Sequence, residues 1–138
     1  MGRKEARAAA FTVLYQTDIQ KCPASEVLEI YYKENKLSTK DKEYINDVVE
    51  GTIKNIEQID SLISGGSKNW NLSRISKIDK AALRLALYEI FYRDDIPDSI
   101  SIYEAVELVK QYDSEDAGGF VNGILRGILR THKDTEEK

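Results

Sequence analysis

One segment, residues 78–92 (IDKAALRLALYEIFY), constrains the fold more than any other part of the chain. On a helix with about 100° between successive residues, its apolar side chains point in every direction. A helix that is apolar all round has to be buried on most sides. This one is too short, and too closely flanked by charged residues, to cross a bilayer. We therefore expect a helical protein with this segment at its centre, surrounded by helices that are apolar on one face only.

The rest of the chain favours helices as well. It has 138 residues, of which 41% are hydrophobic and 32% charged, and only two of them are prolines. Nowhere do β-branched residues alternate with polar ones over any length, as strands require. We predict an all-α protein with six or seven helices, arranged as two small three-helix bundles around the central apolar helix. Residues 1–138 form a single domain with halves at about 1–66 and 78–132 and a joint at about 67–77.

The other helices can be placed from their apolar stripes and end signals. We expect them at about 3–19, 25–35, 39–63 and 101–112, and from about 114 onward. Ser25 is predicted to cap the second helix. Gly65 and Gly66 end the third. Ser101 and Glu104 match a capping box, which places the start of the fifth helix at Ser101.

Glycines recur every four residues near the end of the chain, at Gly119, Gly123 and Gly127. A phosphate-binding loop would need a preceding strand and a following GK[ST] sequence, and neither is present. Glycine in a helix costs roughly 1 kcal/mol but lets another backbone approach closely. We therefore expect this row to pack against a neighbouring helix.

Composition excludes several classes of function. One cysteine and one histidine cannot form a disulfide within the chain or a zinc site of these residues. No acid, base and nucleophile set converges, so we expect no enzyme, no cofactor and no metal site. Asp94, Asp95 and Asp98 lack the spacing of a calcium loop and are interpreted as a solvated turn. The N-terminus has no apolar signal-peptide core, so we expect a cytoplasmic protein without membrane contact.

The N-terminal cations are the one sequence feature that by itself indicates a function. Arg3, Lys4 and Arg7 lie on the first turns of a predicted helix, where free backbone N–H groups add to their attraction for phosphate. Phe11, Tyr15 or Phe120 could offer a ring on which an RNA base stacks. The net charge of −4 argues against indiscriminate nucleic-acid binding but leaves room for this local basic patch.

Four separated blocks of the sequence resemble the NusB family of bacterial transcription antitermination factors. They are RKEARAAAFTVLYQ at the start, DKAALRLALYE in the centre, YEAVELVK in the next helix and FVNGIL in the last. The blocks occur in the family's order and cover nearly the whole chain. The sequence differs from the family pattern at Glu5, where an arginine can stand, and at Gly118 and Gly119, which replace bulkier residues.

The resemblance implies a fold of two small helical bundles without enzymatic activity. It implies a partner, the ribosomal protein NusE, and single-stranded boxA RNA of ribosomal RNA leaders as a ligand. It also implies membership of a transcription antitermination complex with RNA polymerase. Because the basic start is thinner than in many relatives, we expect weak RNA affinity without the protein partner.

The resemblance also implies which residues form the sites. The RNA-binding residues carried over by position are Arg3, Lys4, Arg7, Asp116, Phe120 and Asn122. The partner-binding residues are Tyr15 and Asp79, with Asp79 at the exposed start of the central helix. Arg84 and Glu89, on the same helix, are expected to be paired in the structure.

An alternative remains open from the residues themselves. The chain would then be a non-catalytic helical module that recognises only protein and binds no RNA. It could form a homodimer that hides the basic face. Association that does not depend on salt would favour this alternative, because phosphate binding is strongly salt-dependent.

Overall fold

The computed structural model describes residues 2–66 and 71–133, which contain seven α-helices, one short 3-10 helix and no strand. The helices are α1 (Arg3–Gln20), α2 (Ala24–Glu34), α3 (Thr39–Lys54), α4 (Ile56–Gly66), η1 (Leu72–Arg74), α5 (Lys77–Tyr92), α6 (Asp98–Tyr112) and α7 (Glu115–His132). This confirms the predicted all-α class. Of the predicted joint, residues 67–70 lie outside the described residues. None of the described helices is long and apolar enough to span a membrane.

Helix α5 occupies the centre of the molecule, as its all-round apolar character predicts. It packs against α1, α3, α4, α6 and α7. Leu83 and Leu87 have no exposed surface, and ten of the helix's residues are buried. Ser76 caps its start, because the Ser76 hydroxyl accepts a hydrogen bond of 3.1 Å from the backbone N–H of Asp79.

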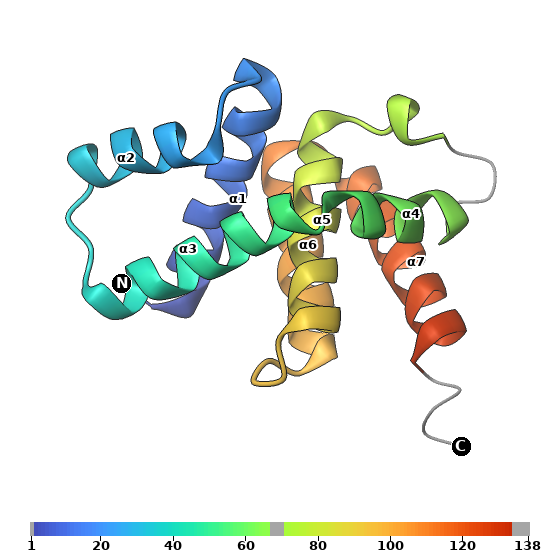
Figure 1. Ribbon diagram of the computed structural model, residues 1–138. Helices are drawn as coiled ribbons and strands as arrows, with labels where there is room; N and C mark the ends of the chain where they lie inside the picture. Colours follow the sequence, from blue (N-terminus) through green and yellow to red (C-terminus); the bar gives the residue numbers. More distant parts are fainter. Residues whose placement is uncertain (1, 67–70, 134–138) are drawn as a thin grey trace.

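The remaining helices form two groups of three around α5 (Figure 1). Helices α1, α2 and α3 pack against one another on one side. Helix α4 packs against α7, and α7 against α6, on the other side. This arrangement confirms the two three-helix bundles around a central helix. Helix α4 precedes the predicted joint in sequence and nevertheless belongs to the second group.

The predicted long helix at 39–63 is wrong, because the structure has two helices there. Helix α3 ends at Lys54, and α4 begins at Ile56. Asn55 separates them with a non-helical backbone, and its side-chain amide donates a 2.8 Å hydrogen bond to the carbonyl of Gly51. The apolar stripe runs through this break without interruption in sequence, so periodicity alone could not reveal it.

Both prolines set the start of a helix, which changes two predicted boundaries. Helix α2 begins after Pro23, so Ser25 lies inside its first turn and does not cap it. Helix α6 begins after Pro97, three residues before the predicted capping box at Ser101. Proline suits the position just before a helix because it has no N–H to leave unpaired. The predicted start of the last helix near residue 114 is confirmed, and the Ser114 hydroxyl caps it by accepting a hydrogen bond from the backbone N–H of Ala117.

The predicted close packing of the glycine row on α7 is also wrong. A Cβ atom added at Gly119 or Gly123 would meet no other atom within 4 Å, and at Gly127 only the end of an arginine side chain 3.9 Å away. The row therefore faces open space. The close contact occurs one residue earlier, at Gly118, where an added Cβ would lie 2.9 Å from the side chain of Lys110.

Candidate nucleic-acid interface

Arg7, predicted to contact RNA, is buried and bound to a carboxylate of the central helix. Only 4% of its surface is exposed. Its Nε atom donates hydrogen bonds of 2.9 and 3.2 Å to the two carboxylate oxygens of Glu89. A second carboxylate, from Glu104, lies 3.9 Å from its Nη1 atom. The prediction of a surface cation at this position is wrong, because the periodicity of α1 turns Arg7 toward α5.

The Glu89 carboxylate joins four helices at one buried point. It accepts hydrogen bonds from the guanidinium of Arg7 on α1, the hydroxyl of Tyr44 on α3 and the hydroxyl of Ser101 on α6. The bond from Ser101 is 2.7 Å long. Burial and the negative charge of Glu89 both raise the pKa of Tyr44, so the hydroxyl keeps its proton as a donor. A buried carboxylate with this many donors is fully satisfied. This ionic centre fixes the start of α1 relative to the rest of the protein.

The predicted basic patch is therefore reduced to two exposed cations. The guanidinium of Arg3 lies 4.3 Å from the centre of the Tyr44 ring, an arrangement that holds a cation by its attraction to the ring. Lys4 is exposed and has no carboxylate partner among the described residues. Gly2 provides no side-chain cap for α1, which leaves the first backbone N–H groups of the helix available to an anion.

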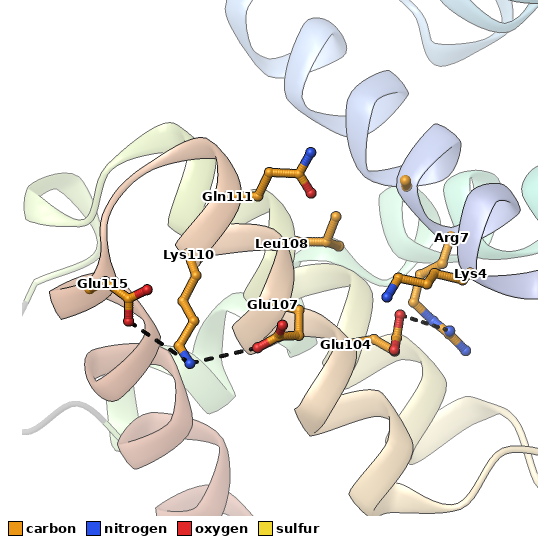
Figure 2. A pocket seen from close by; sticks show the side chains of 9 residues that line it. Lys4, Arg7, Glu104, Glu107, Leu108, Lys110, Gln111 and Glu115 are labelled. Atoms are coloured by element: carbon orange, nitrogen blue, oxygen red, sulfur yellow. Dashed lines mark ion pairs between the residues drawn. The ribbon is translucent and has the colours of Figure 1, made fainter.

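A groove of about 380 Å³ lies between α1 and α6 and reaches the start of α7 (Figure 2). We call it the α1–α6 groove. Its lining residues are Lys4, Arg7, Ala8, Glu104, Glu107, Leu108, Lys110, Gln111 and Glu115. The ring of Phe11 meets that of Tyr112 across the same two helices, with centroids 5.5 Å apart.

Lys110 is held in this groove by two carboxylates. Its Nζ atom lies 3.7 Å from Glu107 and 4.0 Å from Glu115, as the dashed lines in Figure 2 show. The aliphatic part of its side chain crosses α7 at Gly118, which has no Cβ to obstruct it. Gly118, one of the two glycines that depart from the family pattern, therefore has a packing role.

A second pocket, of about 280 Å³, lies at the α6–α7 turn. We call it the acidic pocket. Three of the predicted site residues, Asp79, Asp116 and Phe120, line it together. The structure thus brings the predicted partner residue Asp79 next to two predicted RNA residues. The other lining residues are Arg74, Ile75, Ser76, Asp113, Ser114 and Ala117.

Asp79 is buried, which corrects the expectation of an exposed helix start. Only 6% of its surface is accessible, and its Oδ1 atom has no hydrogen-bond donor among the described residues. Burial, and after it the neighbouring carboxyl group of Asp113, together raise the pKa of Asp79 to about 7. Two carboxyl groups can share a hydrogen bond only when one carries a proton. The pair therefore holds a proton at pH values where a solvent-exposed aspartate is ionised.

The remaining predicted site residues are partly buried or hydrogen-bonded within their own helix. Tyr15 on α1 and Phe120 on α7 pack against the core and keep part of each ring accessible. Phe11 is 4% exposed and is not available for stacking on a base. Asn122 accepts a 3.0 Å hydrogen bond from Arg126 on the same helix. As predicted, both Arg84 and Glu89 are paired: Arg84 binds Asp60, with a shortest distance of 2.9 Å.

Sequence reasoning missed several residues that surround the predicted ones. Glu104 and Ser101 have the spacing of a helix cap, but Glu104 pairs with Arg7 and Ser101 donates a hydrogen bond to Glu89. Gln111 and Asp113 gave no sequence signal, because the groove and the pocket form only when α6 lies beside α1 and α5. Within the described residues, no group of three or more His, Cys, Asp or Glu side chains could hold a metal ion.

The chain is similar to known proteins over almost its full length. A model of the NusB family matches residues 4–130. The transcription antitermination protein NusB of Acetivibrio thermocellus is 48% identical over 94% of this chain and 90% of its own. The protein of the same name from Clostridium acetobutylicum is 41% identical over 97% and 99%.

Solved structures show the same likeness. The structure of T. maritima NusB superimposes with a TM-score of 0.91 and 36% identity, covering 99% of this chain and 96% of that one. A chain from the crystal structure of the antitermination factors NusB and NusE in complex with double-stranded RNA gives a TM-score of 0.87 and 32% identity. The match covers 94% of this chain and 97% of that one.

Proposed function

The chain belongs to the NusB family, and on that premise we propose that it is an RNA-binding transcription antitermination factor that pairs with the ribosomal protein NusE. Its RNA ligand is a single-stranded boxA-type element of ribosomal RNA leaders. It acts in the cytoplasm, within an antitermination complex that includes RNA polymerase. The protein has no catalytic role in this complex.

The observation that carries the proposal is the pair of exposed cations at the open start of α1. Arg3 and Lys4 stand beside backbone N–H groups that no side chain caps. Cations and free N–H groups together bind phosphate. The pair is supported by the likeness to NusB proteins along the whole chain, including one crystallised with NusE and RNA.

The second part of the proposed RNA surface is the start of α7. Asp116, Phe120 and Asn122 contribute there, with the half-buried ring of Phe120 beside a base. A single strand presents unpaired bases that a ring and polar side chains can contact, whereas a duplex hides them. This is why a single-stranded ligand fits the aromatic and polar edge of α7 better than a duplex does.

For the protein partner we propose contacts from Tyr15 and from the acidic pocket. Tyr15 retains an accessible part of its ring on α1. Asp79 contributes from within the pocket, so a partner group has to enter the pocket to reach it. Arg7 is a positioning residue, because it holds the start of α1 in place from the buried side.

The direct test measures the affinity of the protein for a boxA-type single strand, with and without NusE. We expect weak binding alone and much tighter binding with the partner. The corresponding duplex should bind less tightly than the single strand. Failure to bind the single strand even with NusE would contradict the proposal. Salt-independent self-association in that case would favour the protein-only module.

Salt dependence separates residues that touch phosphate from those that position α1. Lys4→Ala should reduce the slope of log affinity against log salt by about 0.7, the value for one phosphate contact on a single strand. Arg7→Lys should weaken binding without changing the slope, because Arg7 is buried. Lys54→Ala, an exposed cation at the far end of α3, is the matched control and should change neither quantity.

A further inference from the structure

We infer that the α1–α6 groove binds one nucleotide of the RNA strand, with its phosphate on Lys4 and its base against the side-chain amide of Gln111. The inference rests on the proposed function and adds a binding site between the two RNA surfaces named above. Neither the groove nor Gln111 is indicated by any sequence pattern.

The charges in the groove select the position of the phosphate. Arg7 and Lys110 are each within 4.0 Å of carboxylates, which compensate their charge. Lys4 is the one cation of the lining that has no such partner within residues 2–66 and 71–133. In Figure 2 its ammonium group points across the groove toward α6. A phosphate therefore gains most by binding at this end.

The middle of the groove suits a base better than a second phosphate. Three carboxylates, from Glu104, Glu107 and Glu115, line it and would repel an anion. Ala8 and Leu108 provide apolar surface between the two helices. A neutral, flat ring with polar edges matches apolar walls bordered by hydrogen-bonding groups.

Gln111 is the group best placed to distinguish one base from another. Its side chain is exposed, and its amide makes no hydrogen bond with any described residue. In Figure 2 the amide points into the space between α6 and α1. An amide offers a donor and an acceptor side by side, which pair with the edge of adenine through two hydrogen bonds.

The residues that line the two ends of the groove are sequence neighbours of proposed RNA-binding residues. It begins at Lys4, beside Arg3, and ends at Glu115. The next residue, Asp116, lines the acidic pocket together with Phe120. A strand that follows the groove from the cations of α1 therefore reaches the α6–α7 turn, which also borders the acidic pocket. This position next to the proposed RNA-binding residues favours RNA over a peptide as the occupant.

The test combines Gln111→Ala with a set of boxA-type RNAs in which each base is replaced in turn, at a fixed, saturating concentration of NusE. We expect the variant to lose about tenfold in discrimination between bases at one position, because one contact with two hydrogen bonds supplies about that much. The salt slope should stay unchanged. Gln111→Glu, which can only accept hydrogen bonds, should shift preference at that position toward cytosine, whose amino group donates. Gln20→Ala, an exposed glutamine at the other end of α1, is the control.

Three outcomes are distinguishable. Unchanged discrimination in both Gln111 variants, with the parent protein binding RNA normally, would overturn the inference and leave the proposed function intact. If the Gln111 variants bind NusE more weakly than the parent protein does in the absence of RNA, the groove belongs to the protein partner. That result would also overturn the inference. Absence of RNA binding by the parent protein with NusE would refute the proposed function itself.

Discussion

Two carboxylates on the same helix, Glu89 and Asp79, lie in opposite chemical situations. Both are buried, with 0% and 6% of their surface exposed. Glu89 receives hydrogen bonds from three other helices. Asp79 faces another carboxyl group, and one of its oxygens has no donor among the described residues. Burial alone therefore does not determine whether a carboxyl group is ionised. The hydrogen-bond donors around it do.

The two carboxylates lie at opposite ends of α5. Its C-terminal half holds α1, α3 and α6 together through a fully bonded anion. Its N-terminal end borders the acidic pocket, where one oxygen of Asp79 has no donor among the described residues and burial and the neighbouring Asp113 raise the pKa of Asp79. A buried group without its donors costs free energy that a bound partner can recover. This favours the N-terminal end of α5, where the polar groups are less well satisfied, as the part of the helix that contributes to the proposed partner site.

The largest effect should come from removing the cation of the ionic centre. Arg7→Met leaves Glu89 buried with only two neutral donors, so we expect a loss of about 3–5 kcal/mol in the free energy of unfolding. Denaturant unfolding measures it. Lys33→Met, which removes an exposed ion pair with Glu29, is the control and should cost at most about 0.5 kcal/mol. Equal losses in the two variants would show that the buried pair has no special role.

The second effect concerns Asp79 and depends on pH. Between its ordinary value of 3.8 and its folded pKa of about 7, the folded state binds a proton that the unfolded state lacks. The contribution of this group to stability is thus fully present below about pH 4 and is lost as the pH rises through 7. Asp79→Asn, whose amide donates to Asp113 without titrating, should be more stable than the parent at pH 8 by on the order of 2 kcal/mol.

Unfolding curves at pH 5 and pH 8 test this expectation. The advantage of Asp79→Asn should shrink at pH 5, where the parent carboxyl is protonated. Asp94→Asn, an exposed change of the same charge, should show no such dependence. A parent protein whose stability rises between pH 5 and pH 8, with the difference absent in Asp79→Asn, would contradict the shared proton.

The smallest effect should come from one donor of the ionic centre. Ser101→Ala removes the 2.7 Å hydrogen bond to Glu89 but leaves Arg7 and Tyr44 in place. We expect a loss of about 1.5 kcal/mol, typical of a hydrogen bond to a charged group. The same unfolding measurement checks it. Ser61→Ala, which removes an exposed bond within α4, is the control and should have a smaller effect. A loss for Ser101→Ala as large as that for Arg7→Met would contradict the expectation that Ser101 contributes only one hydrogen bond to Glu89.

Much of the fold could be predicted from local patterns. The all-round apolar segment at 78–92 predicted a buried central helix, and Ser114 predicted the start of the last helix. The errors arose where a local signal had two physical uses. Ser101 and Glu104 have capping-box spacing, but they belong to the ionic network, and the start of α6 is set by Pro97. The glycine row on α7 has the spacing of a packing face and points to open space.

The sequence by itself determined the all-helical class, the central position of α5 and the cationic start of α1. Helical periodicity and the burial of apolar surface are local properties, so they can be read along the chain. Only the tertiary structure decided which of the N-terminal cations are exposed. Arg7 meets Glu89 across 82 positions of sequence, and Asp79 meets Asp113 only because α6 returns beside α5. Whether a charged side chain binds a ligand or another side chain depends on such distant neighbours, which local sequence does not contain.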